Sequence, residues 1–329
     1  MPFHKNVLQI DAKALTDILV ANLRRDVRKT LRRSGAVVGI SGGIDSSVVL
    51  ALCVRALGPK RVVGIMMPEQ DSSGDSVVLA EKLADRFGVE ALTENMTPAL
   101  AGFGCYPRRD EAVQRVFPDY DPQRDKVKIG LSQDVFDSDA LNVFYLTVVA
   151  PDGEERSKRL KLRDYLQIVA ASNFKQRSRM AMLYYHAEAR NYAVMGTPNK
   201  NEHDQGFFVR WGDGGYDIAP IRHLYKTQVY QLAEYLDVPI EIQQATPTTD
   251  TYSAHSSQQE FFFRLPFEVM DMLLYALDHE VPVSEVAQVM DLTEQQVQRA
   301  LDDLVRKQRT TEYLRARPIE YTDYGPSPA

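Results

Sequence analysis

In the stretch Val37–Leu50, VVGISGGIDSSVVL, the polar string SGGIDSS separates two apolar runs. The run before it predicts a buried strand, and the run after it predicts a helix. A strand that turns into a helix through glycines directs several backbone N–H groups at one point, where the helix N-terminus adds partial positive charge. The sequence therefore predicts an anion-binding corner, which its glycines leave open to the close approach of a ligand.

Asp45 restricts the kind of anion that fits this corner. A carboxylate beside a phosphate is repulsive unless a divalent cation lies between them. The string is not the P-loop of kinases and GTPases, because no Gly-Lys-Ser/Thr follows the glycines. The alternative interpretation is a tight, serine-capped turn without a ligand, which is what an isolated Gly-Gly turn usually is.

Strand and helix patterns alternate on either side of this corner. Apolar residues recur at helical spacing over Asp11–Arg33 and Ser73–Val89, and again directly after the glycines. Strand-like apolar runs are RVVGIMM (Arg61–Met67) and YAVMGT (Tyr192–Thr197). This alternation predicts an α/β fold with a doubly wound parallel sheet that is wrapped by helices.

Two parts of the chain break the alternation. Residues 104–163 are rich in proline and arginine at their start, and they contain a hairpin-like run that turns at Pro151-Asp152-Gly153. We interpret them as an inserted hairpin that serves as a lid or a subunit contact. The other part, residues 251–329, is predominantly helical and predicts a C-terminal helical cap on a domain of residues 1–250.

Within this cap, Val283–Lys307 has the apolar spacing and the threonine N-cap of a helix–turn–helix. The second helix would have to supply basic and base-reading residues to bind DNA. It contains three acidic residues in EQQVQRALDD instead, so a packed helical hairpin is favoured.

The composition is that of an ordinary globular protein, with 329 residues, 44% hydrophobic and 26% charged. A net charge of −6 and a pI near 5.6 argue against a nucleic-acid-binding surface over much of the protein. No apolar run approaches the ~20 residues of a membrane span, and the N-terminus lacks an apolar signal core. We therefore expect a cytoplasmic protein without nucleic-acid or membrane partners.

Several blocks of sequence carry a resemblance to a known family. The glycine string resembles the pyrophosphatase-type ATP-binding motif of the adenine nucleotide alpha-hydrolase superfamily, whose fold is Rossmann-like. Five later blocks, in the same order, resemble motifs of the ammonia-dependent NAD(+) synthetases. They are NFKQRSRM (Asn173–Met180), MGTPNKNE (Met195–Glu202), GFFVRWGDGGYDIAP (Gly206–Pro220), LYKTQVYQLAEYL (Leu224–Leu236) and PTTD (Pro247–Asp250).

The resemblance implies a role for each matching residue. Asp45 and Glu202 correspond to two carboxylates that hold Mg²⁺ on the triphosphate. The residues implied in ATP binding are Ser41, Gly42, Gly43, Ser46, Ser47, Met67, Thr197, Lys226 and Thr248. Those implied in binding the pyridine nucleotide substrate are Arg177, Asp213 and Asp217. Asp45, Lys226 and Asp213 are the implied catalytic residues.

The implied reaction is the ATP- and Mg²⁺-dependent amidation of deamido-NAD with ammonia through an acyl-adenylate, giving NAD, AMP and pyrophosphate. The resemblance also implies a homodimer. Cys53 lies in an apolar helix and Cys105 in a basic segment that we expect to be flexible, so neither suits the nucleophile of a glutaminase. We expect the enzyme to use free ammonia or ammonia from a separate glutaminase partner.

Three alternatives stay open at this point. The region after PTTD and the insertion depart from the family pattern, so the same adenylation could act on a different carboxylic acid. A nucleobase- or tRNA-thiolating enzyme would employ a persulfide cysteine, for which Cys105 is the candidate. A DNA-binding regulator would be retained on DNA in a salt-sensitive manner.

Overall fold

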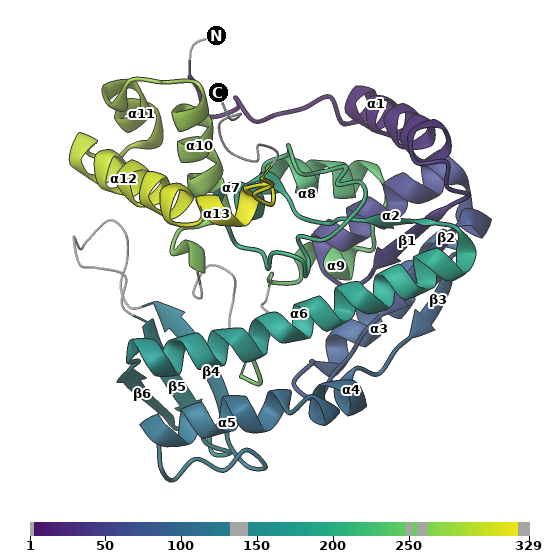
Figure 1. The fold of residues 1–329 in the computed structure, drawn as a ribbon. Coiled ribbons are helices and arrows are strands. Elements are labelled where there is room, and N and C mark those ends of the chain that lie inside the picture. The colour runs from purple at the N-terminus through teal and green to yellow at the C-terminus, as the bar shows by residue number, and fades with distance from the viewer. Residues whose placement is uncertain (1–2, 132–143, 248–251, 255–261, 322–329) are drawn as a thin grey trace, which may run out of the picture.

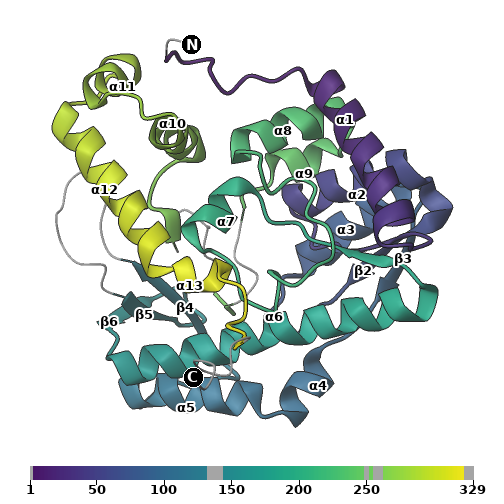
Figure 2. The same ribbon diagram turned by 45° about the horizontal axis from the view of Figure 1, so that its top comes forward.

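The computed structural model describes residues 3–131, 144–247, 252–254 and 262–321. Figures 1 and 2 show a central sheet with helices on both faces, a smaller sheet beside the first half of the long helix α6 (Leu162–Arg190), and a helical C-terminal part. None of the helices in these ranges is both long and apolar enough to cross a lipid bilayer.

The central sheet has four parallel strands in the order β3-β2-β1-β7. Successive residues of β1 point to opposite faces, so Val38 packs against one layer of helices and Val37 against the other. The strands are β1 (Ala36–Gly39), β2 (Val62–Met66), β3 (Glu90–Thr93) and β7 (Ala193–Met195). The predicted doubly wound parallel sheet is confirmed.

One face of the sheet is covered by several helices and the other by α6. The first set comprises α1 (Ala12–Arg25), α2 (Ile44–Leu57), α3 (Gly74–Phe87), α8 (Lys226–Tyr235) and α9 (Ile240–Gln244). The helix predicted over Asp11–Arg33 is shorter than expected, because α1 ends at Arg25 and a π-helical turn follows over Asp26–Thr30. Strand β3 was not predicted, since it is a four-residue edge strand without an apolar run.

The second sheet contains the predicted hairpin. Its antiparallel order is β4-β5-β6, and β5 turns into β6 through Gly153, which has a φ of +88°. The strands are β4 (Lys126–Leu131), β5 (Phe144–Val149) and β6 (Glu155–Arg159). This sheet packs against α5 (Cys105–Val116) and the start of α6 through a core of its own.

The interpretation of the start of this insertion as a flexible basic segment is wrong. Residues 97–102 form α4 (Thr97–Gly102), and Cys105–Val116 form α5, in which Pro107 occupies the first turn, where proline is tolerated. Arg109 is buried and paired with Asp71 rather than presented to solvent. Cys105 is buried, and its thiol donates to the carbonyl of Ala171 at 3.3 Å.

The C-terminal residues form the predicted helical unit. It consists of α10 (Phe267–Asp278), α11 (Val283–Met290), α12 (Glu294–Thr310) and α13 (Glu312–Arg315). Its core includes Phe3 and Leu8 from the N-terminal segment. The run that resembled a helix–turn–helix corresponds to α11 and α12, and both helices bury their apolar faces in this core as a packed hairpin.

Candidate active site

The carboxyl ends of β1 and β7 mark the topological switch point of the central sheet. β1 lies between β2, which follows it in the chain, and β7, which joins the sheet much later. The connections that leave β1 and β7 therefore diverge, and ligands of open α/β sheets bind in the crevice at such a point. Asp45, Thr197 and Glu202 lie just beyond these two strand ends.

The glycine loop after β1 is shaped by its own hydrogen bonds. Gly42 has a φ of +76°, and a Cβ there would lie 2.7 Å from the carbonyl oxygen of Ser76, so only glycine fits. The hydroxyls of Ser46 and Ser47 donate to the carbonyl of Gly43 at 3.0 and 2.8 Å. Gly43 is the N-cap of α2 and has no side chain to cap it, so the first N–H groups of the helix remain available to an anion.

A lysine and a carboxylate meet at the mouth of this loop. Lys226, the first residue of α8, is fully buried, and its ammonium group pairs with Oδ2 of Asp45. Oδ1 of Asp45 accepts a hydrogen bond from Nδ2 of Asn199 at 3.0 Å. Asn199 is in turn the N-cap of α7 (Lys200–Gln205), where its Oδ1 accepts from the N–H of Glu202 at 3.0 Å and its own N–H donates to Oε2 of Glu202 at 3.2 Å. One asparagine therefore joins the two carboxylates that the resemblance assigned to Mg²⁺.

The electrostatics of this group show that its two carboxylates interact. Burial and the nearby charge of Asp45 raise the pKa of Glu202 to about 8. Burial opposes the charged form of Lys226, but Asp45 and Glu202 outweigh it and raise the pKa of the lysine. Two carboxylates therefore share one ammonium group, and this arrangement favours the arrival of a further cation.

The C-terminal helices hold the two short helices of the site in place. Asp271 on α10 is fully buried and accepts from the side chain of Asn201 on α7 and from the N–H of Thr227 on α8, the latter at 2.7 Å. These bonds attach the helices that carry Glu202 and Lys226 to the same carboxylate. The C-terminal unit therefore contributes to the geometry of the site.

The donor set suits Mg²⁺ bound together with a phosphate ligand. Mg²⁺ prefers carboxylate oxygens and is commonly held by one or two carboxylates plus substrate phosphates. Asp45 and Glu202 provide such a pair beside the glycine loop. Within the described ranges, no group of three or more His, Cys, Asp or Glu side chains is placed to hold a metal alone. The remaining ligands would have to come from the nucleotide and water.

Two of the three residues assigned to the substrate, Asp213 and Asp217, lie in the loop between α7 and α8, and the third, Arg177, lies on α6. Asp213 accepts a hydrogen bond from the N–H of Val209 at 2.7 Å. Part of Asp213 is exposed to solvent, but protein packs around its carboxylate. The resulting loss of water raises the pKa of Asp213 to about 6. Asp217 accepts from the N–H of Val194 at 2.8 Å and from the hydroxyl of Tyr184 at 3.1 Å, which ties the loop to β7. Arg177 on α6 donates to the carbonyl of Arg210 at 3.2 Å.

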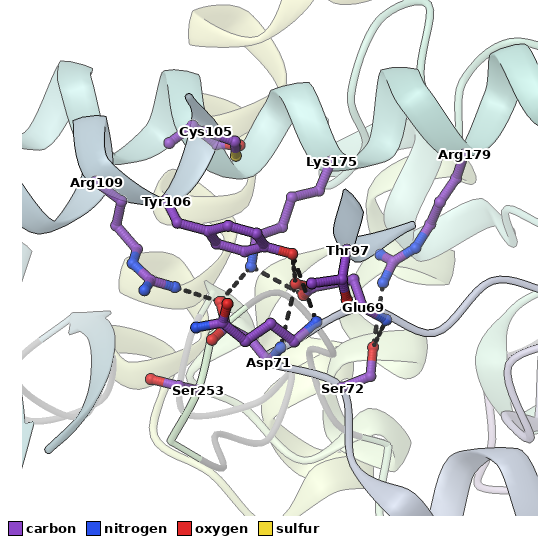
Figure 3. Close-up of polar contacts among 12 residues, drawn as sticks. Glu69, Asp71, Ser72, Thr97, Cys105, Tyr106, Arg109, Lys175, Arg179 and Ser253 are labelled. Atoms are coloured by element: carbon purple, nitrogen blue, oxygen red, sulfur yellow. Dashed lines mark hydrogen bonds and ion pairs between the residues drawn. The ribbon is translucent and has the colours of Figure 1, made fainter. Parts of the chain in front are cut away.

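The segment after β2 is fixed by buried charges (Figure 3). Met67, assigned to ATP, begins this segment, and its carbonyl accepts from Nε of Arg179 at 3.2 Å. The ammonium group of Lys175 lies 2.9 Å from Oε1 of Glu69 and 2.6 Å from Oδ2 of Asp71, both in this segment. We call Glu69, Asp71, Arg109 and Lys175 the buried ionic cluster. It joins the segment after β2 to α5 and α6.

The structure thus brings Asp45, Glu202 and Lys226 together at the glycine loop, with Met67 and Thr197 after the neighbouring strands. Asp213 is close enough to contribute to the pKa of Glu202. Thr248 lies outside the described residues.

Sequence reasoning missed the role of Asn199. An asparagine three residues before a glutamate is the pattern of a helix N-cap, so its place at the start of α7 could have been predicted. Its bond to Asp45 joins residues 154 positions apart and depends on the tertiary fold.

A glycine loop at the switch point of a parallel sheet, with a lysine and two carboxylates at its mouth, defines an α/β enzyme that binds a phosphate-bearing nucleotide. The sequence matches the family model described as NAD synthase over residues 15–115 and 146–318. The chain therefore belongs to the NAD synthase family, and it is an enzyme of that family.

Individual relatives agree with this assignment. An NH(3)-dependent NAD(+) synthetase of Mesorhizobium japonicum is 51% identical over 97% of this chain and 99% of the relative. One of Rhizobium meliloti is 45% identical over 96% of this chain and 94% of the relative. The solved NH3-dependent NAD synthetase of Campylobacter jejuni has the same fold, with a TM-score of 0.61 and 21% identity over 95% of this chain and all of that chain.

Proposed function

We propose that this chain catalyses the ATP-dependent amidation of deamido-NAD with ammonia, giving NAD, AMP and pyrophosphate. The observation that carries the proposal is the group of Lys226, Asp45 and Glu202 at the mouth of the glycine loop, in a chain whose relatives are named NH(3)-dependent NAD(+) synthetases. This group is suited to binding a triphosphate and to stabilising pyrophosphate as it leaves.

The first step is attack by the nicotinate carboxylate of deamido-NAD on the α-phosphorus of ATP. The bond to the β-phosphate breaks, and negative charge accumulates on the departing pyrophosphate. The N–H groups at the start of α2 and the ammonium group of Lys226 lie at the glycine loop and would stabilise this charge. Asp45 and Glu202 would hold Mg²⁺, which supplies Lewis-acid stabilisation of the phosphate oxygens when it is bound.

The second step is attack by ammonia on the acyl-adenylate, which releases AMP and leaves the amide. The nucleophile must be neutral ammonia, so a proton has to leave an ammonium ion. We assign this proton transfer, and the orientation of ammonia, to Asp213, whose carboxylate lies in the loop assigned to the substrate. Arg177 and Asp217 border the same loop and would shape the pocket for the pyridine nucleotide.

We also propose that the enzyme is a cytoplasmic homodimer supplied with free ammonia or with ammonia from a separate glutaminase. Leu162 and Leu166 lie one turn apart on α6, and both are exposed, which is unusual for two leucines on one helix face and suits a subunit contact. Light scattering should give twice the chain mass of 37.2 kDa.

The reaction is tested by incubating the protein with ATP, Mg²⁺, ammonium and deamido-NAD and separating the products. We expect NAD and AMP in equal amounts, with no AMP when deamido-NAD is omitted. Formation of ADP would overturn the proposed chemistry. AMP formation with a different carboxylic acid but not with deamido-NAD would preserve the adenylation and reject the substrate.

A further inference from the structure

A basic groove lies at the edge of the central sheet opposite the active site. It has a volume of about 440 Å³ and is lined by Arg28, Arg32, Arg33, Ser34, Arg61 and Tyr192. The groove spans the amino ends of three adjacent strands. Ser34 lies two residues before β1, Arg61 directly before β2, and Tyr192 directly before β7. The active site uses the carboxyl ends of the same strands, and the groove is therefore a separate place on the molecule.

The groove concentrates positive charge on a chain whose net charge is −6. Over the described ranges, no ion pair involves any of its four guanidinium groups; by contrast, Arg25 one turn earlier pairs with Asp26 at 2.8 Å. Nη1 of Arg33 donates to Oδ1 of Asn191 at 2.8 Å, and this neutral acceptor leaves the charge of the guanidinium group uncompensated. Like charges held together without carboxylates favour the binding of an anion with several negative charges.

The backbone fixes the arginines in this arrangement. The π-helical turn Asp26–Thr30 carries Arg28, and Arg32 has a φ of +54°, where glycine or asparagine is the usual residue. The N–H of Arg33 donates to the carbonyl of Val27, and the N–H of Ser34 donates to the carbonyl of Asn191, both at 2.8 Å. These bonds attach the arginine-bearing segment to the end of α6, so the groove does not depend on flexible chain.

The aromatic side of the groove is built closely against the sheet. A Cβ on Gly35 would lie 2.5 Å from the ring of Tyr192 and 2.4 Å from the carbonyl oxygen of Arg61. Only glycine at this position lets the ring lie across the backbone between the two strands. Tyr192 is half-buried, so one part of its ring is fixed and the other remains open to a ligand.

We propose that this groove binds a small anion with a chain of two or more phosphates, such as inorganic triphosphate or a nucleoside polyphosphate. Guanidinium groups form bidentate hydrogen bonds with phosphate oxygens, and four of them match the charge of a polyphosphate chain. The volume of about 440 Å³ is within the usual range for small-ligand sites, roughly 300–1,000 Å³. The ring of Tyr192 offers a stacking face if the phosphates are attached to a base.

The test is calorimetric titration of the full chain with inorganic tripolyphosphate at physiological salt. Arg28→Gln/Arg61→Gln removes two charges from the groove. Lys13→Gln/Arg25→Gln removes two charges from exposed, ion-paired positions on the same helical segment outside it. We expect the groove variant to lose at least tenfold in affinity for one class of sites, and the control to bind as the wild type does. Because neither pair belongs to the catalytic machinery, kcat and KM for ATP should be unchanged in both.

Two further ligands identify the source of the phosphates. AMP should bind the groove at least tenfold more weakly than tripolyphosphate does, because it has one phosphate. If ATP binds the groove more tightly than tripolyphosphate does, the base is part of the ligand, and Tyr192→Leu should remove the difference in affinity. If the two ligands bind with equal affinity, the site recognises the phosphate chain alone. Equal loss of affinity in the groove and control variants, or an unchanged isotherm in the groove variant, would overturn the proposal. The kinetic measurements separate this outcome from a failure of the proposed reaction.

Discussion

Two of the buried lysines in the described residues pair with carboxylates near the centre of the molecule, Lys226 in the candidate active site and Lys175 in the buried ionic cluster. Both have side chains that are about 1% exposed to solvent. They differ in how their carboxylate partners interact. Asp45 and Glu202 both act on Lys226, and the charge of Asp45 adds to burial in raising the pKa of Glu202 to about 8.

The buried ionic cluster contains a second cation. Lys175 pairs with Glu69 and Asp71, and the hydroxyl of Tyr106 donates to Glu69 at 2.8 Å (Figure 3). Arg109 pairs with Asp71 and with the neighbouring Asp110. Such a network of hydrogen-bonded charges stabilises one arrangement of the chain. In the active site, burial and the charge of Asp45 together disfavour the ionised form of Glu202, and a further cation would favour it. The raised pKa of this carboxylate is therefore what supports a proposed cation site at Lys226, whereas burial of the lysine alone does not.

The largest effect is expected for Lys226→Met. The variant loses the ammonium group that we propose to neutralise the leaving pyrophosphate, so kcat should fall by about 10²- to 10³-fold. Release of AMP under saturating ATP and deamido-NAD measures this. The matched control is Lys200→Met, which removes a lysine paired with Asp204 and Asp278 on the outer side of α7. Similar activity losses in the two variants would contradict a role for Lys226 in the reaction.

Asp45→Asn tests the other half of the active-site group. The substitution keeps the shape of the side chain and removes its charge, so pyrophosphate release should fall by about 100-fold at low Mg²⁺ and recover in part as Mg²⁺ is raised. A matched control is Asp204→Asn, which removes a carboxylate from the same region outside the site. Unchanged activity of Asp45→Asn at low Mg²⁺ would remove this residue from the set of metal ligands.

For the buried ionic cluster we expect a loss of stability that exceeds the loss of activity. Lys175→Met leaves Glu69 without a basic partner in the cluster, and the free energy of unfolding should fall by about 3–5 kcal/mol. Urea unfolding measures this, and kcat at low temperature should change far less than in Lys226→Met. Adding Glu69→Gln should recover part of the stability, because Asp71 keeps Arg109 as its partner. If the double variant recovers no stability, the loss in Lys175→Met does not come from the unpaired charge of Glu69.

Asn199→Ala is expected to lower both the stability and the activity of the protein, each by less than the variants above. Loss of the N-cap of α7 should cost about 1 kcal/mol of stability. Loss of its bond to Asp45 should lower activity by about 10-fold, as for other residues that orient metal ligands. Thr293→Ala removes the equivalent cap from α12, away from the site, so it should lose as much stability with no change in kcat. Equal kinetics for the two variants would assign Asn199 to helix capping alone.

The sequence predicted the parts of the molecule that depend on local pattern. Apolar runs identified β1, β2 and β7, and the glycine string located the loop between β1 and α2, for which phosphate binding is proposed. What it missed depends on contacts between distant residues. Helix α5 was expected to be a flexible basic segment because it is rich in proline and arginine, whereas Arg109 is buried and pairs with Asp71, 38 positions away. Neither the buried ionic cluster nor the bond from Asn199 to Asp45 has a local signature.

The same tertiary burial decides the last and smallest effect, that of Cys105→Ser. Burial raises the pKa of the Cys105 thiol, so the reactive thiolate is disfavoured, and its hydrogen points to the carbonyl of Ala171. A serine hydroxyl can donate to the same carbonyl, so the variant should lose only about 1 kcal/mol of stability. AMP and NAD formation should match the wild type. A large loss of activity in a variant that unfolds normally in urea would instead place a reactive sulfur in the mechanism, as a thiolating enzyme requires.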